Sequence, residues 1–214
     1  NSKYFSEIWV LLSTGSFSMF DNEIIEKLIA AYKLAITNKE SFKKPSFIAN
    51  QTIDATDKII SPGFINMLSW GVETLIEDGK SESDIRQGVT LEVFGEGMSW
   101  GPVNEELKTY MKKNQGDIQY EIAWNTLGEY LQFLENKGVS TNIASFIGAT
   151  TLRVNAIGFE DRKPNADEME LMKKLVHQGM KEGAMGIGSS LIYAPAFYSS
   201  TEELIQICKV AAKY

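Results

Sequence analysis

The amino-acid sequence predicts an α/β fold in which buried strands alternate with amphipathic helices. Three observations indicate this class: short apolar runs bounded by glycine or proline, helix-capping patterns between those runs, and a strand–helix order that repeats four times. Such an order needs crossover connections between parallel strands, and these connections are right-handed. The pattern by itself fits either a closed barrel or an open sheet.

Four apolar runs are expected to form the strands. They are apolar almost throughout instead of alternating with polar residues, which is typical of parallel strands covered on both faces. We therefore expect each strand to be buried within a parallel sheet that helices cover. The runs are residues 59–68, 89–94, 143–150 and 184–190.

Helices are expected where a capping residue is followed three positions later by an acidic residue, because the two side chains can pair with each other's free main-chain N–H groups. Apolar residues then recur at spacings of three and four, as on the buried face of a helix. Gly88 and Gly138 are expected to end the first two helices. The capping pairs are Ser81 with Asp84, Thr126 with Glu129, Asn165 with Glu168, and Ser200 with Glu203.

Residues 1–47 are expected to form an atypical N-terminal segment that is helical, because apolar residues recur at helical spacing over residues 21–37. Residues 42–47 are expected to be a linker, and residues 48–60 a β-hairpin or a strand leading into the sheet. The apolar stretch 8–20 lacks the flank of a signal peptide and is too short to span a bilayer. A buried strand or helix is the preferred interpretation there.

Composition and charge argue against several kinds of partner. The 214 residues carry a formal net charge of −7, so a nucleic acid or an anionic membrane surface is a poor partner. The one cysteine, Cys208, cannot form an internal disulfide, which leaves the redox compartment open and is compatible with the cytoplasmic location that we expect. The one histidine, His177, shares a helix face with charged residues and is expected in solvent rather than at a metal. A metal site with two or three imidazoles cannot be assembled from this chain alone.

Four segments together match a known family in order and spacing. They are TIDATDKIISPGFINMLSW (residues 52–70), RQGVTLEVFGEGMSWGPV (86–103), FIGATTLRVNAIGFEDRKP (146–164) and EGAMGIGSSLIYAPAFYSSTEEL (182–204). Through them the chain resembles the N-acyl-D-amino-acid deacylases (D-aminoacylases) of the amidohydrolase superfamily. The resemblance implies that residues 48–214 form the N-terminal half of a (β/α)8 TIM barrel, an incomplete barrel of about four strand–helix units. Residues 1–47 lie outside it and do not look like the small β-rich domain with which family members begin.

The resemblance also implies zinc chemistry, in which a metal-activated water attacks an amide carbonyl while an Asp transfers the proton. The family's His-x-His pair falls on Leu68 and Trp70, which cannot bind zinc, and the acid before it falls on Asn66. The family's cysteine ligand corresponds to Glu96, and a carboxylate can also bind zinc. We therefore expect one zinc ion in the full-length protein, with Glu96 as a ligand; a solvated loop carboxylate is the alternative. The remaining ligands and the catalytic Asp correspond to positions beyond Tyr214, so no catalytic residue is expected here.

Three residues after later strands are candidates for substrate binding. The resemblance suggests that the loop after the fourth strand contacts substrate, where Ser190 and Tyr193 could hydrogen-bond a carboxylate or an amide; simple packing is the alternative for Tyr193. Arg153 could bind a substrate carboxylate through its planar guanidinium group, and the alternative is a structural ion pair with Glu160 or Asp161. The implied substrate is a small N-acyl amino acid or a peptide-like compound.

Two functions remain open at this point. In the first, the chain is a fragment of a metal-dependent amidohydrolase that cleaves the N-acyl amide bond of a (D-)amino acid or a similar compound, and the fragment alone is inactive. The alternative is a non-catalytic, amidohydrolase-like protein used for binding or assembly, which the apolar residues at positions 68 and 70 favour. A half barrel exposes strand edges and a core face, so self-association is expected in either case.

Overall fold

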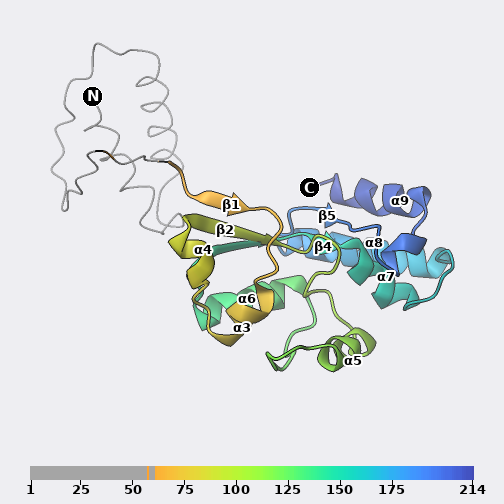
Figure 1. Ribbon diagram of the computed structural model, residues 1–214. Helices are drawn as coiled ribbons and strands as arrows, with labels where there is room; N and C mark the ends of the chain where they lie inside the picture. Colours follow the sequence, from red (N-terminus) through yellow and green to blue (C-terminus); the bar gives the residue numbers. More distant parts are fainter. Residues whose placement is uncertain (1–56, 58–60) are drawn as a thin grey trace, which may run out of the picture. The chain divides into compact units, whose positions relative to one another are not determined.

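The computed structural model describes Asp57 and residues 61–214, and the elements described below lie in residues 64–214 (Figure 1). The expectations for residues 1–47, and nearly all of those for residues 48–60, lie outside the described residues. They stay predictions, and so does the division of the chain at residue 47. None of the helices in the described part is both long and apolar enough to cross a membrane.

Parallel strands form the centre of the unit. Strands β1 (Phe64–Asn66), β2 (Val89–Phe94) and β3 (Asn142–Ser145) pair in the order β1-β2-β3, and β4 (Ile147–Gly148) pairs with β5 (Ile187–Gly188). The two sheets meet at one residue: the N–H of Phe146 donates to the carbonyl of Phe94 at 2.9 Å, and the next N–H, of Ile147, donates to Gly186 at 2.9 Å. Residues 142–148 therefore pair first with β2 and then with β5, so the strands are neighbours in their sequence order.

The mixed α/β fold with parallel strands is confirmed, and the exact strand bounds differ from those expected. Val89–Phe94 is a strand over its whole predicted length. The predicted strand at residues 143–150 is divided at Phe146 and ends at Gly148, because the helix that follows begins at Ala149. The predicted fourth strand is reduced to Ile187–Gly188.

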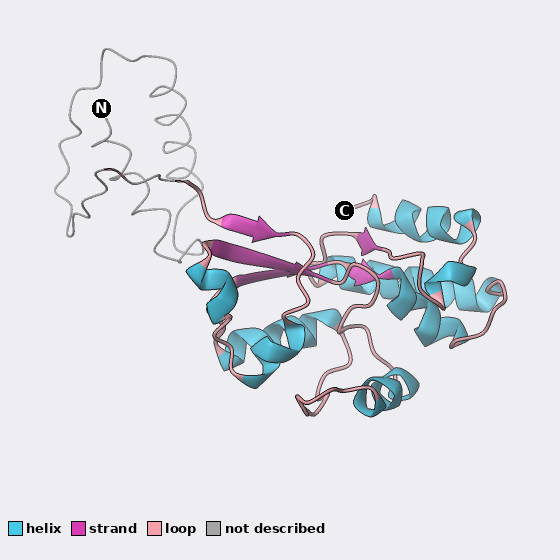
Figure 2. Ribbon diagram, viewed as in Figure 1, coloured by secondary structure: helices cyan, strands magenta, loops and turns pink. Residues whose placement is uncertain are grey.

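Helices alternate with these strands (Figure 2). Two of the predicted capping boxes are present in full, at Thr126 with Glu129 and at Asn165 with Glu168, and Ser200 caps its helix through the N–H of Glu203. Gly138 ends the second predicted helix with a φ of 80°. The helices are α3 (Val72–Glu77), α4 (Glu82–Arg86), α5 (Glu105–Lys113), α6 (Leu127–Lys137), α7 (Ala149–Ile157), α8 (Ala166–Lys181) and α9 (Thr201–Ala211), with a 3-10 helix η2 (Ala196–Tyr198).

The capping interaction predicted for Ser81 is absent. Ser81 precedes α4 in a left-handed conformation, with a φ of 43°, and its side chain makes no capping hydrogen bond. Its hydroxyl donates instead to the Glu92 carboxylate at 2.5 Å. The same hydroxyl lies 3.5 Å from an Asp84 carboxylate oxygen, so the Glu92 carboxyl group on the neighbouring strand is its nearer partner.

Three helices have no counterpart among the predictions: α3, α5 and α7. Helix α5 has a polar cap, since the Asn104 side chain accepts from the N–H of Leu107 at 2.8 Å. Helix α7 is buried around almost its whole circumference, from Ala149 to Val154 and again at Ile157. A helix without a polar face has no amphipathic periodicity, which explains why the pattern missed it.

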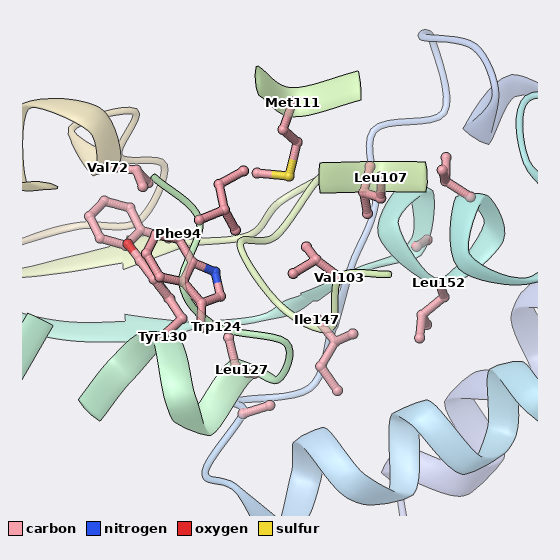
Figure 3. Packing of buried hydrophobic residues seen from close by; sticks show 14 of the residues in the cluster. Val72, Phe94, Val103, Leu107, Met111, Trp124, Leu127, Tyr130, Ile147 and Leu152 are labelled. Carbon is pink, nitrogen blue, oxygen red and sulfur yellow. The ribbon is translucent and has the colours of Figure 1, made fainter. Parts of the chain in front are cut away.

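The core lies between the sheet and these helices (Figure 3). The sheet contributes Phe94 of β2, and helix α5 contributes Leu107. Tyr130 comes from α6, and Trp124 comes from the segment before that helix. The rings of Trp124 and Tyr130 lie 5.2 Å apart, a tilted contact of the kind that aromatic pairs prefer. Burial raises the pKa of the Tyr130 phenol, whose hydroxyl has no hydrogen-bond partner.

The two faces of the sheet differ in how they are covered. Phe94 packs among the helices, and since side chains alternate along a strand, Glu92 lies on this same face. The opposite face carries Ile65, which pairs in register with Leu91 and is 55% exposed. The expectation that every strand is buried on both faces is therefore wrong for β1.

A substitution at Tyr130 tests this core. Tyr130→Phe removes a buried hydroxyl that has no partner, so we expect the free energy of unfolding to stay level or rise by about 1 kcal/mol. Tyr120→Phe is the matched control, because that hydroxyl accepts from Trp100 at 3.0 Å and lies 3.3 Å from a Glu73 carboxylate oxygen. The control should lower the free energy of unfolding in urea titrations. A clear loss of stability in Tyr130→Phe would contradict the assigned packing.

Candidate site at the carboxyl end of the sheet

The loop that follows β2, residues 95–102, is fixed against the ends of the next strands. Ser99 is fully buried; its hydroxyl accepts from the N–H of Gly148 at 3.0 Å and donates to the carbonyl of Gly101 at 2.6 Å. The N–H of Thr150 donates to Gly97 at 3.0 Å. The first residues of α7 therefore hold the loop in one position.

Glycines make this close packing sterically feasible. A Cβ atom on Gly148 would meet the backbone of Gly97, and one on Gly188 would meet the backbone of Gly95 and Glu96. Gly95 also has a φ of 85°, which favours glycine. Loop and strand ends thus touch backbone to backbone, and this contact fixes where residue 96 lies.

Glu96 lies in this loop at the position expected for an active-site group. It is partly exposed, and its carboxylate makes no hydrogen bond or ion pair with any residue that the structure describes. No group of three or more His, Cys, Asp or Glu side chains that could hold a metal ion is found among the described residues. Within the part of the chain that the structure describes, Glu96 therefore has no polar partner and no second metal-binding side chain joins it.

Ser190 lies beside the same loop. A Cβ atom on Gly97 would be 2.9 Å from the Ser190 Cβ, so the two residues are in van der Waals contact. Tyr193 continues this segment, with its N–H 3.4 Å from the Ser190 carbonyl and its side chain 63% exposed. The structure thus brings the loops of Glu96 and Ser190 together and leaves the Tyr193 phenol in solvent.

Arg153 does not face a ligand, so its predicted role in substrate binding is wrong. Its side chain is fully buried, and Nη1 donates to both carboxylate oxygens of Glu203, at 2.9 and 2.8 Å. Nη2 donates to the main-chain carbonyls of Glu160 and Arg162. The alternative of a structural ion pair is correct in kind, but the partner is Glu203 of α9 rather than Glu160 or Asp161.

The segment after β1 presents apolar side chains outward. Leu68 is 49% exposed and Trp70 is 68% exposed, whereas Ser69 between them is buried and donates to Glu92 at 2.6 Å. Asn66 donates through Nδ2 to Asp84 at 3.3 Å. The residues at the positions of the family's imidazoles are therefore accessible, and they are hydrophobic.

Sequence reasoning missed the most deeply buried acid, Glu92. Its carboxylate is fully buried and accepts hydrogen bonds from three hydroxyl groups, those of Ser69, Ser81 and Thr141, the last at 2.9 Å. None of the described ion pairs includes it. The sequence could have indicated a buried acid here, because Glu92 is the only acidic residue within VTLEVF, a strand that is otherwise largely apolar. Glu92 ties the end of β1 to α4 and β3, so it positions the segment that carries Leu68 and Trp70.

A separate groove of about 420 Å³ lies between the first turns of α8 and α9. Lys163, Lys173, Glu202 and Glu203 line it, so its charge is mixed. None of the predicted site residues is among its lining residues. The candidate site therefore rests on the loop after β2 and the segment after β5.

The mixed α/β fold with parallel sheets matches that of an amidohydrolase-type domain. No protein-family model matches the chain. A curated relative, the D-aminoacylase of Alcaligenes xylosoxydans xylosoxydans, is 28% identical over 165 residues, which is 75% of this chain and 33% of the relative. The chain thus spans about a third of the length of that relative.

Solved structures agree with this comparison. A structure of D-aminoacylase, described for the functional role of its binuclear metal centre, has a TM-score of 0.59 and 29% identity, and the match covers 70% of this chain and 31% of that one. N-acyl-D-glutamate deacylase from Bordetella bronchiseptica, solved with zinc and a phosphonate inhibitor, has a TM-score of 0.65 at 23% identity, over 79% of this chain and 35% of that one, and supports the fold alone. The resemblance to N-acyl-D-amino-acid deacylases is confirmed.

The buried ion pair gives a stability prediction. Glu203→Leu leaves the Arg153 guanidinium buried without its counter-charge, which should cost about 3–5 kcal/mol of unfolding free energy. Adding Arg153→Met to this variant should restore much of the loss, because two apolar side chains can replace a buried pair. Urea denaturation measures both variants, with Glu121→Leu at the exposed pair to Lys112 as a control that should change little. Equal stability of wild type and Glu203→Leu would contradict a structural role for Arg153.

Proposed function

We propose that residues 64–214 form four consecutive strand–helix units of a (β/α)8 barrel, and that the protein built on this barrel hydrolyses the N-acyl amide of an amino acid. The observation that carries the proposal is the loop after β2, which is fixed at the carboxyl ends of parallel strands and presents Glu96 there. Active-site groups of such barrels lie at this end of the strands. The similarity to metal-dependent D-aminoacylases supports the class of reaction.

In this proposal the described residues bind and orient the substrate. The Ser190 hydroxyl and the Tyr193 phenol would hydrogen-bond the amide or the carboxylate of a small N-acyl amino acid, and Leu68 and Trp70 would contact its apolar parts. All four side chains are at least partly exposed, so a ligand can reach them. The buried Arg153 takes no part.

The metal that this chemistry uses does not fit the described residues by themselves. Glu96 is one oxygen ligand, and zinc sites in enzymes use three protein ligands. His177 does not add a second, because it lies on the exposed side of α8 against Tyr214. We propose one zinc ion whose further ligands come from outside the described residues.

A second candidate function is a barrel that binds an N-acyl amino acid without hydrolysing it. Leu68 and Trp70 favour it, because both are accessible and neither can bind a metal. The fixed loop after β2 and the segment at Ser190 would serve binding equally well. The two candidates therefore share a ligand class and differ in zinc content and turnover.

The protein expressed from its complete gene separates the two candidates. We expect about one zinc per chain, hydrolysis of N-acyl-D-amino acids, and loss of the zinc in Glu96→Ala, since that substitution removes a ligand. Glu135→Ala, at an exposed position of α6, is the control and should keep both properties. An unchanged zinc content in Glu96→Ala would remove Glu96 from the metal site, and binding without zinc or turnover would favour the second candidate. The 214-residue chain assayed alone is expected to show no hydrolysis.

A further inference from the structure

Helix α7 carries polar side chains although it is buried along most of its length. Three of them, Thr151, Arg153 and Asn155, make hydrogen bonds to segments that lie elsewhere in the sequence. The helix lies beside α8, β4 and the 3-10 helix η2 (Figure 1). Because a buried polar group is costly unless it is hydrogen-bonded, the partners of these side chains indicate what the helix holds in place.

The first two turns of α7 hold the loop after β2. The N–H of Ser99 donates to the Thr151 hydroxyl at 2.7 Å, and this hydroxyl lies 3.2 Å from the Ser99 carbonyl oxygen. The Asn155 side chain donates through Nδ2 to the carbonyl of Pro102 at 2.9 Å. The loop that presents Glu96 is therefore attached to α7 at its middle and at its end.

The same helix holds the segment after β5 through Arg153. Nη1 of Arg153 donates to both carboxylate oxygens of Glu203, and the Ser199 hydroxyl donates to one of these oxygens at 3.1 Å. Ser199 lies at the end of the segment that carries Ser190 and Tyr193. The buried ion pair therefore reaches the second half of the candidate site through one hydroxyl group.

Short turns connect this anchor to the rest of the segment. The N–H of Phe197 donates to the carbonyl of Tyr193 at 2.9 Å, and the N–H of Ser199 donates to that of Ala196, a fully buried residue, at 3.0 Å. At its other end the segment begins at Gly188, which pairs within the sheet of β4 and β5. The segment is thus held at both ends, by strand pairing and by the buried ion pair.

We infer that Arg153 is a positioning residue, which fixes the segment after β5 against the loop after β2 without contacting the ligand. Charge-assisted hydrogen bonds fix direction as well as distance, so an ion pair suits this task. Stability alone does not require the pair, since apolar side chains can replace a buried pair. All contacts that support the inference lie within the described residues, and it rests on the proposed function only for the use of these two segments in binding.

The double variant Arg153→Met/Glu203→Leu separates positioning from stability, because it should recover much of the stability that Glu203→Leu alone loses. Hydrogen–deuterium exchange, measured on the protein expressed from its complete gene, reports on the segment. We expect amides of residues 189–199 to exchange about tenfold faster, while those of α6 keep the wild-type rate. The matched control is Arg86→Met/Glu82→Leu, at an exposed ion pair of α4, which should change neither.

Ser199→Ala tests the same link without disturbing the ion pair, and it decides the matter if the double variant does not fold. It removes only the hydrogen bond to Glu203, so residues 189–199 should again exchange about tenfold faster. Ser199→Thr keeps a hydroxyl group and should exchange at the wild-type rate. Wild-type exchange over residues 189–199 in Ser199→Ala or in the folded double variant, or a uniform increase along the whole chain, would overturn the inference.

Hydrolysis of N-acetyl-D-leucine by the same variants tests the link to function. We expect KM to rise about tenfold and kcat to stay within about twofold, because the displaced groups bind the substrate and do not react with it. An unchanged KM together with faster local exchange, or a wild type without turnover, would count against the proposed function. The exchange rates still decide whether Arg153 positions the segment, so the two failures are distinguishable.

Discussion

The structure depends on the backbone-to-backbone contact between the loop after β2 and the ends of β4 and β5. Gly95, Gly97, Gly148 and Gly188 permit it, because a Cβ atom at any of them would meet a neighbouring backbone or side chain. Ser99 then fixes the contact through its buried hydroxyl. The loop after β2 and the segment after β5, which are far apart in the sequence, form one surface in this way. Main-chain contacts hold this surface in place, and the side chains that would bind a ligand do not contribute to them.

The sequence predicted the features that depend on local chemistry and missed those that depend on distant partners. The capping boxes of α6 and α8 were predictable because both members lie within one helical turn. The burial and the ion-pair partner of Arg153 were not predictable, since Glu203 is 50 residues away and the burial of Arg153 follows from tertiary packing. Ser81 failed as a cap for the same reason, because Glu92 competes for its hydroxyl. Of the candidate site, the position of Glu96 was predictable from the glycines around it, whereas its contact with the Ser190 segment required the fold.

Glu92 shows how a buried polar group supports the site without belonging to it. Three hydroxyl groups satisfy a carboxylate that has no cation nearby among the described residues, so the strand tolerates an acid in its buried face. Through Ser69 this cluster holds the chain between Leu68 and Trp70, and both side chains point outward as a result. The loop after β2 and the segment after β5 thus present one carboxylate, that of Glu96, and two hydroxyl groups, those of Ser190 and Tyr193, while the segment after β1 presents apolar side chains. We propose that these groups suit an amphipathic ligand such as an N-acyl amino acid.

We propose that the loop after β2 (residues 95–102) and the segment after β5 (residues 189–193) together bind an N-acyl amino acid. Amide chemical-shift changes in the ¹⁵N-labelled chain, titrated with N-acetyl-D-leucine, test it most directly. We predict changes at residues 95–101 and 189–193, and their loss in Gly97→Ala, where a Cβ would press on Ser190, but not in Gly116→Ala, where it meets nothing within 4 Å. Changes confined to the groove between α8 and α9, or none at saturating ligand, would contradict the account.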